Sequence, residues 1–166
     1  MGTQENLQAA FAGESQANRK YLAFAAKAEM DGYPQIARLF RAAADAETVH
    51  AHAHLRAMKG VHTTAENLQE AIAGEGYESR DMYPAFLEAA QAEGNQGAIV
   101  SFRNALAVEK IHYELYENAL RALQGGKDLP AAKVFVCGVC GNTVEGEAPD
   151  HCPVCGVPKA RFAEVK

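Results

Sequence analysis

Side chains that bind metals recur at fixed spacings in this 166-residue sequence. All four cysteines lie in its last thirty residues, as Cys137-x-x-Cys140 and Cys152-x-x-Cys155, each pair followed by glycine. Each turn offers two thiolates, and two facing turns form a tetrahedral site with four sulfur ligands. Disulfide pairing is the alternative, but clustered cysteines in a chain without a secretory signal favour a metal. Sulfur ligands alone do not separate a structural zinc from a redox-active iron.

Glutamate and histidine form a second recurring pattern. Glu47-x-x-His50 is repeated as Glu109-x-x-His112, and a spacing of three places both side chains on one face of a helix. Four glutamates occupy helix positions that otherwise follow an apolar stripe, namely Glu14, Glu47, Glu75 and Glu109. A buried carboxylate without a partner is costly, so these positions indicate a bound cation.

Helices must position these glutamates, because residues 1–124 are rich in Ala, Leu, Glu and Gln. Apolar residues recur there every three to four positions, which is typical of amphipathic helices. Breaks at 31–34 and 93–95, an interruption of the third helix at 82–84 and a capping-box pattern at 63–66 predict four helices in an antiparallel-type bundle. Gly125, Gly126 and Pro130 end the helical part, so residues 125–133 are predicted to be a linker before a small domain at 134–166.

An internal repeat predicts two helical hairpins. Residues 6–15 match residues 67–76 at seven of ten positions, an offset of 61, and the two Glu-x-x-His motifs are offset by 62. When each hairpin is folded at its turn, its ligand-type side chains meet at one height. Two packed hairpins would bring seven of them into one core layer: Glu14, Glu47, His50, Glu75, Glu78, Glu109 and His112.

Such a layer is the pattern of a dinuclear carboxylate site in a four-helix bundle. Carboxylate and imidazole ligands suit iron or manganese, and bridging carboxylates let two metals change oxidation state together. One Glu-x-x-His pair alone is usually solvated, but two copies at matched heights favour the metal site. Tyr21 and Tyr83 lie near Glu14 and Glu78 along the helices, where each either hydrogen-bonds a ligand carboxylate or packs in the core.

Charge and hydropathy exclude other classes. Sixteen Lys and Arg against twenty-one Asp and Glu give a formal net charge of −5, which argues against nucleic-acid binding. No stretch approaches the roughly 20 apolar residues that span a bilayer. The first residues lack the basic and apolar segments of a secretory signal, so we expect a cytoplasmic protein without membrane association.

Together these motifs resemble the rubrerythrin family over essentially the whole length. The resemblance rests on Gly13-Glu14-Ser15-Gln16-Ala17-Asn18, Glu47-x-x-His50, Gly74-Glu75-x-Tyr77-Glu78 with Met82-Tyr83-Pro84, Glu109-x-x-His112 and the paired cysteine turns. It implies an all-α, ferritin-like four-helix bundle with a di-iron centre in residues 1–124. After the linker, it implies a metal-stabilised rubredoxin-like domain in 134–166 with one iron held by Cys137, Cys140, Cys152 and Cys155.

The resemblance also implies roles for the seven bundle residues. Glu47 and Glu109 would bridge the two irons, Glu14 would bind one iron, and Glu75 and His112 the other. The additional carboxylate, Glu78, would exchange with His50 as a ligand when the oxidation state changes.

The implied activity is reduction of hydrogen peroxide to water in oxidative stress defence, with electrons returning through the four-cysteine iron. Because the sequence has no G-x-G-x-x-G motif after a strand, NADH or NADPH would act through a separate reductase, and a rubredoxin is a further candidate donor. A rubredoxin-like domain at the chain end can serve a neighbouring subunit, so we expect a homodimer or larger assembly. A ferroxidase or iron-storage protein and a zinc-stabilised peroxide sensor are the alternatives.

Overall fold

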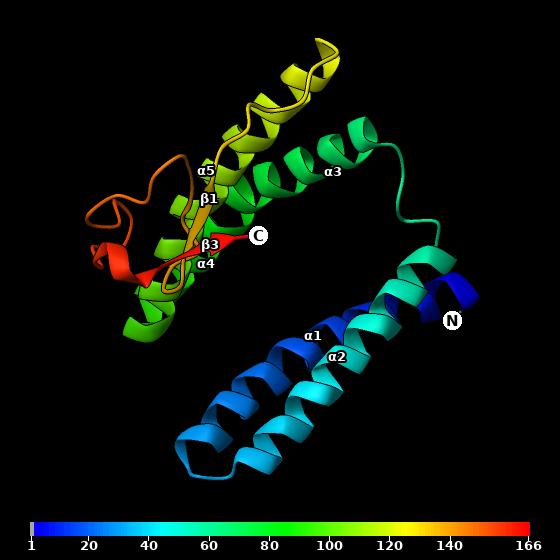
Figure 1. The fold of residues 1–166 in the computed structure, drawn as a ribbon, viewed down its shortest axis with the longest axis vertical. Helices are drawn as coiled ribbons and strands as arrows, with labels where there is room; N and C mark the ends of the chain where they lie inside the picture. The colour runs from blue at the N-terminus through cyan, green and yellow to red at the C-terminus, as the bar shows by residue number, and fades with distance from the viewer. Residues whose placement is uncertain (1) are drawn as a thin grey trace. The chain divides into compact units, whose positions relative to one another are not determined.

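A computed structural model describes residues 2–166, which form two compact units (Figure 1). The first unit ends at His62 and the second runs from Thr63 to Lys166. The first is a hairpin of α1 (Thr3–Met30) and α2 (Pro34–Ala57). Gly32, with a φ of 81°, turns the chain between them, and Pro34 opens α2, where its missing N–H costs no helical hydrogen bond. No helix in the part of the chain described is long and apolar enough to cross a membrane.

Small side chains bring α1 and α2 together. The buried apolar positions of this hairpin are all alanines, namely Ala25, Ala28, Ala37, Ala44 and Ala51. One buried polar side chain crosses the interface: Asn18 Nδ2 donates to the Ala44 carbonyl at 2.7 Å and to Thr48 Oγ1 at 2.9 Å. Asn18 therefore satisfies its own amide protons and ties α1 to α2 one turn beyond Glu14.

The second unit begins with a helical segment that changes its hydrogen-bonding pattern without breaking. α3 (Thr64–Tyr77) continues through a π-helical turn, η1 (Glu78–Met82), into α4 (Tyr83–Glu93). The capping box expected from the sequence is present, with Glu66 N donating to Thr63 Oγ1 at 3.3 Å and Thr63 N to the Glu66 carboxylate at 3.0 Å. The interruption expected at 82–84 takes the form of this π turn, which ends at Met82, and Pro84 sits in the first turn of α4, where proline is tolerated.

A long helix and a small sheet complete the second unit. Gly94, with a φ of 69°, ends α4, and α5 (Gln96–Gln124) packs against α3 and α4. Three short antiparallel strands follow in the order β2-β1-β3: β1 (Val134–Cys137), β2 (Thr143–Glu145) and β3 (Phe162–Val165), with a 3₁₀ turn, η2 (Lys159–Arg161), before β3. Strand β2 contacts α5, so the sheet rests on the helix of its own chain.

Candidate metal centres

The α1–α2 hairpin brings three of the expected ligands together. One ligand atom each from Glu14, Glu47 and His50 lies within 4.8 Å of the others. His50 Nδ1 is 2.9 Å from Glu47 Oε2, as the i, i+3 spacing on α2 requires. These three donors face one another from two helices, which is the arrangement that a bound cation needs.

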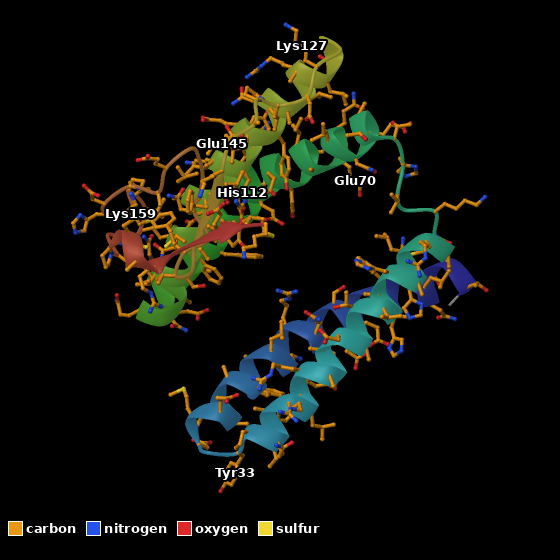
Figure 2. All side chains as sticks on the ribbon, in the orientation of Figure 1. Tyr33, Glu70, His112, Lys127, Glu145 and Lys159 are labelled. Carbon is orange, nitrogen blue, oxygen red and sulfur yellow. The ribbon has the colours of Figure 1, made fainter. Side chains whose placement is uncertain are left out.

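A second set of the same composition lies in the second unit. Glu75 from α3 meets Glu109 and His112 from α5, again with one ligand atom of each within 4.8 Å of the others. His112 Nδ1 is 2.8 Å from Glu109 Oε2 and 3.8 Å from Glu75 Oε1. Figure 2 labels His112 in the second unit. The prediction that both sets share one layer spans the two units and stays a prediction.

Two carboxyl groups at this second set, those of Glu75 and Glu78, have raised pKa values when no cation is bound. Burial, together with the hydrogen bond and negative charge of Glu109, raises the pKa of Glu75 to about 7. Burial and the charge of Glu109 also raise the pKa of Glu78. A divalent cation would stabilise the charged carboxylates against both their burial and their mutual repulsion, so the donor set fits a metal centre.

The π turn places Glu78 and Tyr83 next to each other along the helix. The amide of Tyr83 donates to the carbonyl of Glu78, five residues earlier, so the two residues are one turn apart. Burial raises the pKa of the Tyr83 hydroxyl, and the charges of Glu78, Glu109 and Glu75 raise it further. The phenol therefore keeps its proton at neutral pH and can donate it to a nearby oxygen.

Tyr21, the other tyrosine singled out in the sequence, has a different environment. Its ring lies 6.3 Å from that of Phe24 and 6.1 Å from that of Phe40. Within residues 2–62 it makes no hydrogen bond to Glu14. Its described contacts are those of a side chain that packs in an aromatic cluster.

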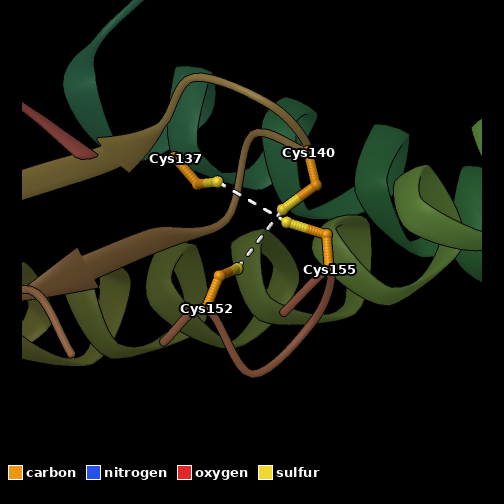
Figure 3. Close-up of side chains that lie close together, drawn as sticks. All are labelled: Cys137, Cys140, Cys152 and Cys155. Atoms are coloured by element: carbon orange, nitrogen blue, oxygen red, sulfur yellow. Dashed lines mark hydrogen bonds between the residues drawn. The ribbon is translucent and has the colours of Figure 1, made fainter. Parts of the chain in front are cut away.

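The four cysteines converge at the end of the chain that carries the sheet. Their sulfur atoms all lie within 4.8 Å of one another, and none is in a disulfide (Figure 3). Cys137 Sγ is 3.8 Å from Cys155 Sγ, and Cys140 Sγ is 3.5 Å from Cys152 Sγ. Disulfides are therefore absent from the described chain, and the four sulfurs surround a point where a single ion would fit.

The thiol pKa values indicate why these sulfurs need a metal. Burial raises the pKa of Cys152, but backbone N–H groups of Cys155 and Val154 outweigh it and lower this pKa to about 7. Burial raises the pKa values of Cys140 and Cys155. Without a cation Cys152 ionises more readily than Cys140 and Cys155, whereas a bound cation stabilises the thiolate form of every ligand.

Two contacts in the candidate centres could not be expected from the sequence motifs. His112 Nε2 lies 3.0 Å from Thr143 Oγ1 of β2, and the Thr143 hydroxyl is 3.1 Å from the Gly141 carbonyl oxygen. Thr143 lies 31 residues from His112, and no local pattern signals their contact. The contact of Asn18 with Ala44 and Thr48 is the other, and its only signal in the sequence is an amide on the stripe of α1 that also carries Glu14.

Families of known proteins match both the helical part of the chain and the part that carries the four cysteines. The family model described as Rubrerythrin matches residues 5–120, and the model described as Rubrerythrin, rubredoxin-like domain matches residues 135–163. Rubrerythrin-2 of Clostridium acetobutylicum is 38% identical, over 96% of this chain and 95% of its own length. Nigerythrin of Nitratidesulfovibrio vulgaris is 40% identical, over 96% of this chain and 85% of its own.

Solved structures of nigerythrin are also similar to this chain. A structure of nigerythrin in a mixed-valent state has a TM-score of 0.58 and 38% identity, covering 99% of this chain and 87% of that one. A fully reduced, all-ferrous nigerythrin has a TM-score of 0.59 and 37% identity, with the same coverage. On the family match and these relatives, the chain belongs to the rubrerythrin family, with a ferritin-like helical bundle and a rubredoxin-like domain whose cofactors are a di-iron centre and one iron bound by four cysteines.

Proposed function

We propose that the chain is a non-haem di-iron peroxidase that reduces hydrogen peroxide to water in defence against oxidative stress. The observation that carries this proposal is the presence of two Glu/Glu/His sets of equal composition and a four-cysteine cluster on one chain. A bundle that only stored or oxidised iron would have no use for the cluster. The excess of ligands, with Glu78 beside the second set, also favours a centre that changes its coordination during a reaction.

The ligands would be shared as the family pattern implies. Glu47 and Glu109 would bridge the irons, Glu14 would hold one, and Glu75 and His112 the other. Glu78 would replace His50 when the oxidation state changes. The surroundings of His50 support this exchange, since its side chain is 55% exposed within the described chain and only its Nδ1 contacts a neighbour, Glu47.

Peroxide reduction consumes two electrons and two protons for each O–O bond that breaks, giving two water molecules. When bound, the irons would supply both electrons together, which avoids a free hydroxyl radical. The side chains would supply the protons: Tyr83 holds a proton on its hydroxyl, and burial and the charge of Glu109 raise the pKa of Glu78, so its carboxyl group binds a proton more readily than a free carboxyl group does. The cysteines place a one-electron carrier on the same chain, to be reduced by a separate NAD(P)H-dependent reductase or a rubredoxin.

Mixing anaerobically reduced protein with peroxide or with oxygen tests the proposal. A peroxidase oxidises its iron much faster with peroxide and then turns over when a reductase and NADH are present. Much faster oxidation by oxygen with accumulation of iron oxide would instead identify a ferroxidase. Zinc in the cysteine site of the natively expressed protein, with no sustained turnover, would identify a sensor.

A further inference from the structure

We propose that the side-chain amide of Asn142 stabilises the reduced state of the iron bound by the four cysteines and so raises its reduction potential. The amide nitrogen Nδ2 donates to Cys152 Sγ at 3.7 Å. Asn142 is only 1% exposed and Cys152 only 2%, so bulk water does not compete for this contact. The effect on the iron is separate from peroxide chemistry, whereas its value to the electron relay rests on the proposed function.

The two cysteine turns show why an asparagine at this position needs an explanation. Cys137 and Cys152 begin turns of the same pattern, and the repeat aligns Asn142 with Val157. In the first turn the N–H of Cys137 donates to the Asn142 carbonyl at 2.9 Å. In the second turn the N–H of Cys152 donates to the Val157 carbonyl at 2.8 Å. The carbonyl contact is therefore made equally well by valine.

The backbone N–H groups at these two positions are matched as well. That of Asn142 hydrogen-bonds to the sulfur of Cys140. That of Val157 hydrogen-bonds to the sulfur of Cys155. Valine thus makes every backbone contact that asparagine makes, and what the second turn lacks is the side-chain amide of Asn142.

The chemistry of the amide contact fits a charged sulfur. A neutral thiol is a weak acceptor, so burying an amide against it is costly, whereas an ionised sulfur accepts a stronger, charge-assisted hydrogen bond. Backbone N–H groups of Val154 and Cys155 reach the same sulfur of Cys152. Two backbone donors and one side-chain donor therefore converge on Cys152 Sγ, which is the surrounding that a metal-bound thiolate needs.

The donor favours the ferrous form for an electrostatic reason. Four thiolates around a ferric ion carry one net negative charge, and the electron that reduces the ion raises this charge to two. A hydrogen bond to sulfur stabilises the more negative state more, so the amide raises the reduction potential. Under the proposed function, the cysteine iron then accepts one electron from its reductase or rubredoxin more readily and holds it until an oxidised iron of the bundle takes it.

The test pairs Asn142→Val with Val157→Asn in the full, iron-loaded chain. Asn142→Val copies the residue of the second turn, so it removes the amide and keeps the backbone contacts. Val157→Asn adds an amide at the matching position, which the repeat of the turns directs toward Cys137 Sγ. A potentiometric titration followed by the visible absorption of the ferric cysteine site measures both. At a fixed potential we expect the ratio of ferrous to ferric iron to fall about tenfold in Asn142→Val, which is about 59 mV for one electron, and to rise in Val157→Asn.

A measurement without a redox reaction separates this tuning from a structural role. Cobalt(II) in the cysteine site has sulfur-to-metal absorption bands, and their energy rises when a hydrogen bond stabilises the sulfur lone pairs. We expect Asn142→Val to move these bands to longer wavelength and Val157→Asn to shorter wavelength, with a tetrahedral spectrum in both. A residue with only a structural role would change the affinity for cobalt or the thermal stability but neither the band position nor the potential.

The potential is measured without peroxide, so the inference stands or fails apart from the proposed function. An unchanged or raised potential in Asn142→Val would overturn it. If Asn142→Val does not hold iron, Val157→Asn decides, and an unchanged or lowered potential there would overturn it. Wild-type protein that does not react with peroxide would refute the proposed function and leave the result on Asn142 standing.

Discussion

Glu75 is a candidate ligand residue whose negative charge conflicts with its buried surroundings. In the chain without metal, burial and the nearby Glu109 raise its pKa from 4.5 to about 7. The folded chain therefore binds a proton at Glu75 more tightly than the unfolded chain does. Because metal binding requires the carboxylate, protons and cations compete for this position near neutral pH.

We predict that the metal-free protein becomes less stable as the pH rises from about 5 to 7.5, in part through Glu75. A group whose pKa is higher in the folded state stabilises the fold fully below its unfolded pKa, and this contribution is lost as the pH rises through the folded pKa. Glu75→Gln, which cannot ionise, should lose less stability over the same range. Thermal unfolding of metal-free protein followed by circular dichroism measures the difference in slope.

The matched control for this experiment is Glu70→Gln. Glu70 lies on the same helix but is exposed, so its substitution should leave the pH dependence of the wild type unchanged (Figure 2). Parallel curves for wild type and Glu75→Gln would show that Glu75 is not the group that titrates. With cobalt bound, we expect the slope of the wild type to reverse, because deprotonation then completes the metal site.

Glu78 is predicted to affect the reaction with peroxide more than metal retention. Glu78→Ala removes a carboxyl group with a raised pKa next to Tyr83, but leaves the Glu75, Glu109 and His112 set complete. We expect normal iron content and oxidation by peroxide that is slower by about tenfold or more, since proton transfer by a placed side chain contributes about 10²–10⁴-fold. Glu88→Ala, which changes an exposed glutamate on α4, serves as the control in anaerobic stopped-flow measurements. Unchanged kinetics of Glu78→Ala would contradict both the proton transfer and the ligand exchange proposed for Glu78.

At the scale of elements, the sequence predicts what depends on local pattern. The long helices follow from apolar spacing, the start of α3 from the capping box at Thr63, and the small domain from its cysteine turns. The π turn at 78–82 could not be predicted, because the same residue types fit an α-helix and only the surrounding packing selects the i, i+5 hydrogen bond. The contact of Thr143 with His112 is tertiary and has no sequence period that could signal it.

The alanine interface of the first hairpin makes a prediction at this scale. Ala44 is 0% exposed and its carbonyl accepts the Asn18 amide, so α1 and α2 leave no room for a larger side chain there. Ala44→Leu should reduce the free energy of unfolding by about 1–3 kcal/mol, as overpacking of a tight core does. Ala42→Leu, on an exposed position of α2, is the control. Chemical denaturation measures both, and equal stability of the two variants would show that the interface can widen at little cost.

For the whole molecule, the cysteine cluster is a structural element and, under the proposed function, also an electron carrier. The sheet that surrounds it consists of strands of three or four residues, and its few buried side chains include Cys137, Cys152, Asn142 and Ala148. So small a core cannot supply much stability, so the metal must supply a large part of it. A substitution of one cysteine therefore removes the proposed electron carrier and also weakens this fold, and an experiment on the proposed relay has to separate the two effects.

Zinc in the cysteine site separates them. Cys152→Ser should abolish turnover driven by a reductase and NADH, yet leave intact a single oxidation of the bundle iron by peroxide, because the Glu and His ligands do not include the cysteines. Wild-type protein with zinc at the cysteines and iron in the bundle keeps the small fold but has no redox-active ion there. We expect it to behave like Cys152→Ser in both assays, measured by NADH consumption and by stopped-flow absorbance. Sustained turnover of the zinc form at the wild-type rate would show that electrons reach the bundle without the cysteine site. Loss of the single oxidation in Cys152→Ser, with its retention in the zinc form, would show that the bundle depends on the folded domain resting on α5.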